Sequence, residues 1–301
     1  PFDHSVDVHS ERVGDVLTET LTTPIGVLTA TWGYTGSVAW IPHPLKSLVS
    51  NGDELRIFHA AIDHLAETTY TPDYSAYHQI DAEVGDEGVA TISLMNSPLM
   101  YLIEMVLGLQ NTYFLLADHR ADMEDILAKL HAAMVRYVRD VLAPAPAQVV
   151  IQYENTSSTL LSPRVFRQYC LPFLNEYADI LAQAGKVFLV HMCGKIRAFT
   201  EDIRHARFAG VADIAPPPTG DLPLDQALVA LPGKVVIGGI DPTLFIEPDL
   251  ERFRRSVSDL IGAIRPYSGV LLGSADTTPR GTPVDNLRAV MDLVATEGAY
   301  M

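Results

Sequence analysis

Cysteine is scarce in this chain, which has Cys170 and Cys193 among its 301 residues. Two cysteines cannot build a disulfide framework, and Cys170 falls within a helical apolar pattern, so we expect a protein of the reducing cytoplasm. Basic residues are also few: 21 stand against 37 acidic residues, which gives a formal net charge of −16. This balance argues against partners such as nucleic acid and anionic membrane surfaces, which bind through basic faces.

Long apolar runs are missing as well. The most apolar segment, residues 99–109, contains Glu104 and is shorter than the roughly 20 residues that a membrane-spanning helix needs. The sequence does not open with the charged segment and apolar stretch of a signal peptide. We therefore expect a soluble, cytoplasmic protein that has no membrane partner.

Strand-like and helix-like segments alternate along most of the chain. The expected strands are residues 88–95, 148–154, 186–192, 210–214, 234–239 and 269–273, and the expected helices are 163–184, 195–206, 222–230, 249–264 and 282–296. Such alternation predicts right-handed βαβ units and a parallel sheet. We favour a single α/β domain of the (β/α)8 TIM-barrel type over a doubly wound open sheet. The length is near the ~250 residues typical of that barrel, and the Gly-rich dinucleotide fingerprint of the open sheet is missing.

The beginning of the chain has a less regular pattern. Residues 1–46 show a turn signal at 22–26 and one short β-prone run at 27–32. Residues 44–69 carry apolar positions at helical intervals, interrupted at 51–52, which predicts two helices. We expect residues 1–84 to be an N-terminal segment whose helices pack on the barrel, and residues 85–301 to be the main barrel.

In a barrel of this type, chemistry lies at the carboxyl ends of the strands. One expected strand end delivers His191 and Cys193, which stand two apart, so both side chains point the same way. An imidazole and a thiolate at a strand-to-helix corner can supply half of a tetrahedral zinc site. The alternative is that His191 is a hydrogen-bonded core residue and Cys193 a small apolar one.

Carboxylates follow the other strands, namely Glu154, Asp213, Asp241 and Asp276. Each has an alternative role as a helix cap or turn residue, and for Asp213 we favour that structural role. Glu154 ends a strongly apolar strand, where burial of an unpaired carboxylate is costly. It therefore needs a cation, a hydrogen-bond donor or a metal.

Four segments, taken in order, carry a resemblance to a known family. They are Glu154 with Leu161-Ser162-Pro163, His191-Met192-Cys193-Gly194, Gly238-Gly239-Ile240-Asp241-Pro242, and Thr282-Pro283-Val284-Asp285-Asn286-Leu287. This combination resembles the uroporphyrinogen decarboxylase superfamily, and more narrowly its corrinoid-dependent methyltransferase branch, over at least residues 85–298. In that branch, the resemblance implies, zinc is held by the His and Cys of a His-x-Cys motif and by a Cys from a later strand end, and it activates a thiol.

His191 and Cys193 match the first two ligands, but the later cysteine has no counterpart in residues 273–279. Asp276 is the best-placed substitute, and Glu154 is a candidate fourth ligand. Both are also candidates for acid–base work. Replacement of a thiolate by carboxylates gives a harder ligand set that donates less charge to the metal. This argues against the thiol acceptor that is usual in that branch.

The function that the resemblance implies is zinc-dependent transfer of a methyl group between a corrinoid (cobalamin), carried by a partner protein, and a small-molecule donor or acceptor. One alternative is a metal-free decarboxylase in which Asp241 and His191 stabilise charge on a pyrrole-like substrate. It fits less well, because residues 31–35 offer no arginine where that branch carries an Arg-Gln-Ala-Gly-Arg segment. Another alternative is a barrel that binds a small molecule without catalysis.

Overall fold

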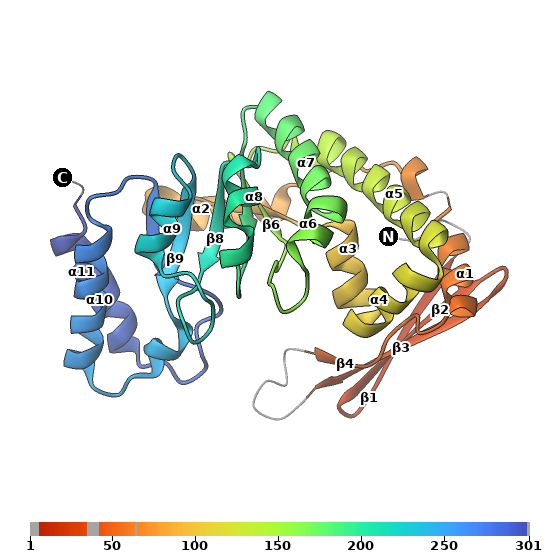
Figure 1. The fold of residues 1–301 in the computed structure, drawn as a ribbon, viewed down its shortest axis with the longest axis horizontal. Coiled ribbons are helices and arrows are strands. Elements are labelled where there is room, and N and C mark those ends of the chain that lie inside the picture. The colour runs from red at the N-terminus through yellow and green to blue at the C-terminus, as the bar shows by residue number, and fades with distance from the viewer. Residues whose placement is uncertain (1–5, 35–41, 64, 300–301) are drawn as a thin grey trace. The chain divides into compact units, whose positions relative to one another are not determined.

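A computed structural model of the chain describes residues 6–34, 42–63 and 65–299 (Figure 1). Its contacts divide the chain into two compact units, one made of residues 1–73 and 97–144 and the other of residues 74–96 and 145–301. Each unit therefore combines segments that are distant in sequence. The expected boundary after residue 84 does not coincide with this division and stays a prediction.

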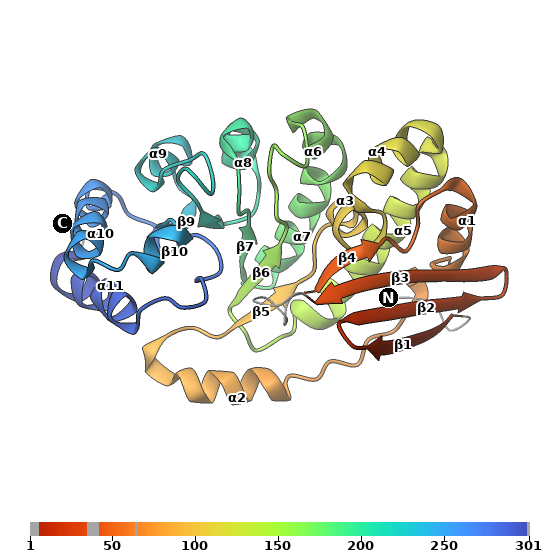
Figure 2. The same ribbon diagram turned by 90° about the horizontal axis from the view of Figure 1, so that it is seen from below.

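The first unit begins with a four-stranded antiparallel sheet whose strands follow chain order (Figure 2). The strands are β1 (Asp7–Val13), β2 (Val16–Thr23), β3 (Gly26–Tyr34) and β4 (Pro42–Lys46). The turn predicted at 22–26 and the extended run predicted at 27–32 are confirmed by the hairpin of β2 and β3, whereas β1, β2 and β4 were not predicted. Strand β1 is exposed along its whole length, so it lacks the apolar alternation that marks a half-buried strand.

Helices complete the first unit. They are α1 (Gly52–Ala61), the 3-10 turn η2 (Leu65–Glu67), α3 (Pro98–Tyr101), the π-helical turn η4 (Leu102–Val106), α4 (Gly108–Asp118), α5 (Arg120–Tyr137) and the π-helical turn η5 (Val138–Leu142). Helix α1 begins after Asn51, whose side chain accepts hydrogen bonds from the amides of Asp53 and Glu54 at 3.0 Å each. The helix predicted just before Asn51 was wrong, because that segment includes β4.

The second unit is built on six parallel strands, and the order β5 to β10 in the sheet is the order in the chain. Its elements are α2 (Ser75–Val84), η3 (Gly85–Glu87), β5 (Thr91–Leu94), β6 (Val149–Tyr153), α6 (Pro163–Tyr169), α7 (Leu171–Gln183), β7 (Val187–His191), η6 (Arg197–Phe199), α8 (Thr200–His205), β8 (Gly210–Ile214), α9 (Leu224–Ala230), β9 (Val235–Ile240), η7 (Pro242–Ile246), α10 (Leu250–Ile264), β10 (Val270–Ser274) and α11 (Val284–Glu297). All six predicted strands are present. Sequential order is that of a barrel wall, whereas a doubly wound sheet reverses direction. Within the described residues β5 and β10 form the two edges.

Helices hold this sheet through apolar faces. In α10 the buried residues Phe253, Val257, Ile261 and Ile264 recur at helical spacing, and the first three join a core cluster with Ile240 of β9 and Leu293 of α11. Burial of each such side chain stabilises the fold by roughly 1.5–3 kcal/mol. This packing fixes the strands, so the loops at their carboxyl ends have defined positions.

Among the described residues, no helix combines the length and the apolar character that crossing a bilayer requires.

Candidate metal centre

Three predicted ligands lie together in the second unit. His191 is the last residue of β7, Cys193 follows two residues later, and Asp276 follows β10. A nitrogen, the sulfur and a carboxylate oxygen of these residues lie within 4.8 Å of one another. Ligands of a tetrahedral zinc ion lie about 3.5 Å apart, given Zn–N and Zn–S bonds near 2.0 and 2.3 Å. Small side-chain rotations therefore suffice to bring the three donors onto one ion.

The short distance between His191 and Asp276 also indicates that the sheet is curved. Strands β8 and β9 separate β7 from β10. In a flat sheet, three strand spacings of about 4.8 Å would hold the two strand ends roughly 14 Å apart. The close approach of His191 and Asp276 therefore requires a curled sheet and a loop after β10 that turns inward, as in a barrel wall.

The loop that carries Cys193 is fixed by the neighbouring strand end. Gly194 has a φ of +124°, and an added Cβ there would lie 3.0 Å from the Ser157 hydroxyl oxygen. That oxygen accepts a hydrogen bond from the Lys195 amide at 3.2 Å. The Cys193 thiol itself is half-buried and donates to Asn155 Oδ1 at 3.7 Å. The thiol is therefore held by a neighbouring loop and is still partly accessible.

His191 is held from the side of β8. Its Nδ1 atom is completely buried and contacts a carboxylate oxygen of Asp213, and it has no further hydrogen-bond partner among the described residues. Burial disfavours the charged imidazole, but the Asp213 carboxylate and the Cys193 thiol outweigh it and raise the pKa of His191 to about 10. A histidine binds metal through a neutral imidazole nitrogen, so metal binding at this ring would be coupled to the loss of a proton.

Asp213 reaches His191 because β8 is irregular at this point. The backbone φ of Asp213 is +65°, and the register between β8 and β9 shifts between Val211 and Ile214. Ile214 pairs with Gly238, where an added Cβ would lie 2.7 Å from the Ile214 nitrogen. A bulge of this kind re-aims a side chain at a functional site. The structural role that the sequence favoured for Asp213 missed this contact, although an aspartate inside a buried strand was a signal.

The other two predicted carboxylates lie outside the group. Glu154 follows β6 and is completely buried, and its backbone amide donates to the His191 carbonyl at 3.1 Å. Within the described chain it is not a member of the three-residue group, so its role as a fourth ligand stays a prediction.

Asp241 has a visible structural role. It begins η7 and accepts hydrogen bonds from the amide and hydroxyl of Thr243, at 2.8 and 2.5 Å, and from the Thr219 amide at 3.2 Å. Burial opposes ionisation of this carboxyl, but these hydrogen bonds hold its pKa below the ordinary value. Its catalytic role stays a prediction.

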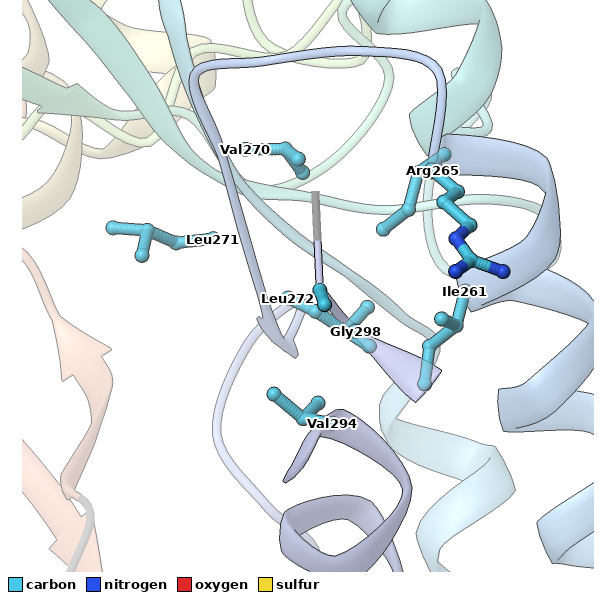
Figure 3. Close-up of a pocket in the computed structure, with 9 residues that line it drawn as sticks. Ile261, Arg265, Val270, Leu271, Leu272, Val294 and Gly298 are labelled. Carbon is cyan, nitrogen blue, oxygen red and sulfur yellow. The ribbon is translucent and has the colours of Figure 1, made fainter. Parts of the chain in front are cut away.

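A separate apolar cavity of about 300 Å³ lies beside β10 (Figure 3). It is lined by side chains of α10, β10 and α11, including Ile261, Val270, Leu272 and Val294. The charged side chain in its lining is Arg265, and none of His191, Cys193 and Asp276 lines it. This cavity belongs to the packing of the helices on the sheet.

The family model of uroporphyrinogen decarboxylase (URO-D) matches residues 49–296. Because the match spans most of the chain, the chain belongs to the uroporphyrinogen decarboxylase family. The family has the TIM-barrel fold, so the predicted fold class is confirmed, and β5 to β10 are six consecutive strands of such a wall.

A solved structure, "methyltransferase from Methanosarcina mazei", is similar to this one with a TM-score of 0.59. The similarity covers 86% of this chain and 73% of that chain at 16% sequence identity. At that identity the likeness shows the fold alone. Among curated proteins, none matches the chain.

Proposed function

We propose that this protein is a zinc-dependent methyltransferase that moves a methyl group between a corrinoid on a partner protein and a small-molecule substrate. The observation that carries the proposal is the convergence of His191, Cys193 and Asp276 within 4.8 Å. An imidazole, a thiolate and a carboxylate are all zinc ligands, and three protein ligands leave one position open, as catalytic zinc sites do.

In this proposal each residue has a distinct task. His191, Cys193 and Asp276 hold the metal, and Asp213 orients the His191 ring through Nδ1, which leaves Nε2 for the metal. Glu154, buried at the end of β6, moves a proton, or it is a fourth protein ligand and the substrate then binds as a fifth ligand. Bound here, a zinc ion would supply Lewis-acid chemistry toward a substrate atom at the open position.

The donor set favours one class of substrate. A site with one thiolate, one imidazole and carboxylates leaves more positive charge on the metal than a site with two thiolates. Such a metal polarises oxygen or nitrogen ligands well and promotes a reactive thiolate poorly. We therefore infer that the substrate is an ether, an amine or a pterin rather than a free thiol.

The two alternatives make different demands on the same residues. A metal-free decarboxylase of this fold has no need for Cys193, whereas a binding barrel has no need for turnover. Neither accounts for an aspartate whose carboxylate joins the histidine and cysteine of a His-x-Cys segment. This arrangement favours the methyltransferase.

The experiment is a methyl-transfer assay with wild type, Asp276→Ala and Glu154→Ala. Methylcobalamin is offered with thiol and non-thiol acceptors, and methoxylated donors are offered with reduced cobalamin. We expect turnover with a non-thiol substrate, and a loss in Asp276→Ala at least as large as in Glu154→Ala. Turnover with a free thiol alone, at a rate and zinc content unchanged in Asp276→Ala, would contradict the proposal.

A further inference from the structure

The first unit contains a pocket of its own, with a volume of about 390 Å³. It lies on the inner face of the antiparallel sheet, and its other wall comes from α3 and η4. Nearly all of its lining is apolar or aromatic, and one lining residue, Glu19 of β2, carries a carboxylate. The volume falls within the roughly 300–1,000 Å³ of small-molecule sites, whose few polar groups set specificity.

Glu19 occupies a position that the sheet otherwise gives to apolar side chains. Residues two apart on a strand share a face, so Glu19 points to the same side as buried Leu21. Across the strand pair it faces Ala30, which is also buried. Because the Ala30 side chain is small, space remains beside it in the pocket. The Glu19 carboxylate projects into this space.

The surroundings leave this carboxylate without a counter-charge. Its Oε2 atom accepts a hydrogen bond from Trp32 Nε1 at 2.6 Å, and no lysine, arginine or histidine of the described chain pairs with it. Burial and the charge of Glu19 together raise the pKa of Tyr101, across the pocket, to about 12. A half-buried carboxylate among apolar groups is costly unless a cation reaches it.

The opposite wall has an unusual backbone. Met105 and Val106, which line the pocket, belong to the π-helical turn η4, closed by a hydrogen bond of 2.7 Å from the Leu107 amide to the Leu102 carbonyl. Turns of this kind are rare and lie frequently at functional sites. Independently of the charge, this turn is a second feature of the pocket that is typical of functional sites.

We propose that this pocket binds a small organic ammonium ion. The positive nitrogen lies against Glu19, and its carbon substituents contact Leu21, Met105 and the aromatic side chains of Trp32 and Tyr101. Aromatic rings attract ammonium groups, most strongly where water is excluded. The neutral amide or hydroxyl of an uncharged ligand would leave the carboxylate without a counter-charge.

The test compares choline with its uncharged carbon analogue, 3,3-dimethylbutan-1-ol, by isothermal titration calorimetry on the full chain. Tetramethylammonium serves as a second ammonium probe. We expect saturable binding of both ammonium ions and at least tenfold weaker binding of the alcohol. Equal binding of choline and the alcohol, or no saturable binding of either ammonium ion, would overturn the proposal.

Variants locate the binding. Glu19→Gln keeps an acceptor for Trp32 but removes the charge, and Ala30→Val fills the space in the pocket. Each variant should bind choline at least tenfold more weakly than wild type. The control is Glu11→Gln, which removes the same charge from the exposed strand β1 and should bind as wild type does. Wild-type affinity in both pocket variants, or a tenfold loss in the control, would contradict the assignment. His191→Ala should bind choline normally, so the outcome is independent of the metal centre.

Discussion

The imidazole of His191 lies against the carboxylate of Asp213, with its Nδ1 atom buried at the contact. The two residues belong to neighbouring strands, β7 and β8. In metal sites, a carboxylate that accepts from one ring nitrogen fixes the tautomer and orientation of the histidine, and its loss costs roughly 10–100-fold in metal affinity. In the proposed zinc site, this contact would fix the orientation of His191 as a ligand.

The first prediction concerns Asp213→Asn. Asparagine tolerates the left-handed backbone that residue 213 adopts, so the fold should remain while the charge is lost. We expect zinc affinity, measured by competition with a chelating dye, to fall roughly 10–100-fold. The control is Asp259→Asn on the exposed face of α10, which should leave the affinity unchanged. An equal affinity for Asp213→Asn and wild type would show that Asp213 does not position the ligand.

The second prediction concerns the bulge that aims Asp213. In Gly238→Ala the new Cβ would meet the Ile214 nitrogen at 2.7 Å, and the φ of +123° is strained for any side chain. We expect this variant to lose about 1–3 kcal/mol of unfolding free energy, read from the midpoint of urea unfolding, and to bind zinc more weakly. Gly273→Ala in β10 is the matched control, because no atom lies within 4 Å of its added Cβ. If both variants unfold at the same midpoint, Gly238 does not maintain the bulge.

Much of the second unit followed from the sequence. The apolar runs of β6, β7 and β9 sit between clear helical patterns, so both their type and their order could be predicted. Of the four-stranded sheet, the sequence predicted the run at 27–32 in β3 but missed β1, which has no buried face and whose residues show no alternation. The segment before Asn51 was predicted as a helix because Leu45, Leu48 and Val49 have helical spacing, yet tertiary pairing places Leu45 in β4.

The candidate site was predicted in part. The sequence paired His191 with Cys193 through spacing alone, and Asp276 took the place of the missing cysteine by its position after a strand. For Asp213 the sequence favoured a role as a cap or turn residue, although its place inside a buried strand was a signal. The contact with His191 depends on the register shift opposite Gly238, which the sequence pattern does not predict.

The third prediction concerns Asp241 and acid stability. Its carboxylate caps η7 and has a lowered pKa, so its contribution is complete above the ordinary value of 3.8 and declines as the pH falls below that value. At neutral pH, the free energy of unfolding of Asp241→Ala should be about 1–2 kcal/mol lower than that of wild type. Urea unfolding of both proteins as a function of pH measures the difference. A gap that widens on acidification would contradict this role.

The fourth prediction concerns Asp276→Cys, which restores two thiolates. Two thiolates leave less positive charge on the metal, so we expect this variant to retain zinc and to shift its preference toward thiol acceptors. The ratio of turnover with a thiol to turnover with a non-thiol substrate should rise at least tenfold over wild type. Asp285→Cys, which adds a thiol at an exposed position in the first turn of α11, is the control and should leave the ratio unchanged. If Asp276→Cys retains zinc but its ratio is unchanged, the identity of the metal ligands does not determine the substrate preference.

The most direct test of the metal centre is the zinc content of purified protein, measured by plasma mass spectrometry. We predict close to one zinc ion per wild-type chain, and loss of that zinc in His191→Ala and in Cys193→Ala, with both variants folded by circular dichroism. Cys170→Ala is the control, because Cys170 is a buried thiol outside the group, and it should retain the metal. Full zinc in both His191→Ala and Cys193→Ala, or wild-type protein that takes up none when zinc is supplied, would contradict the account.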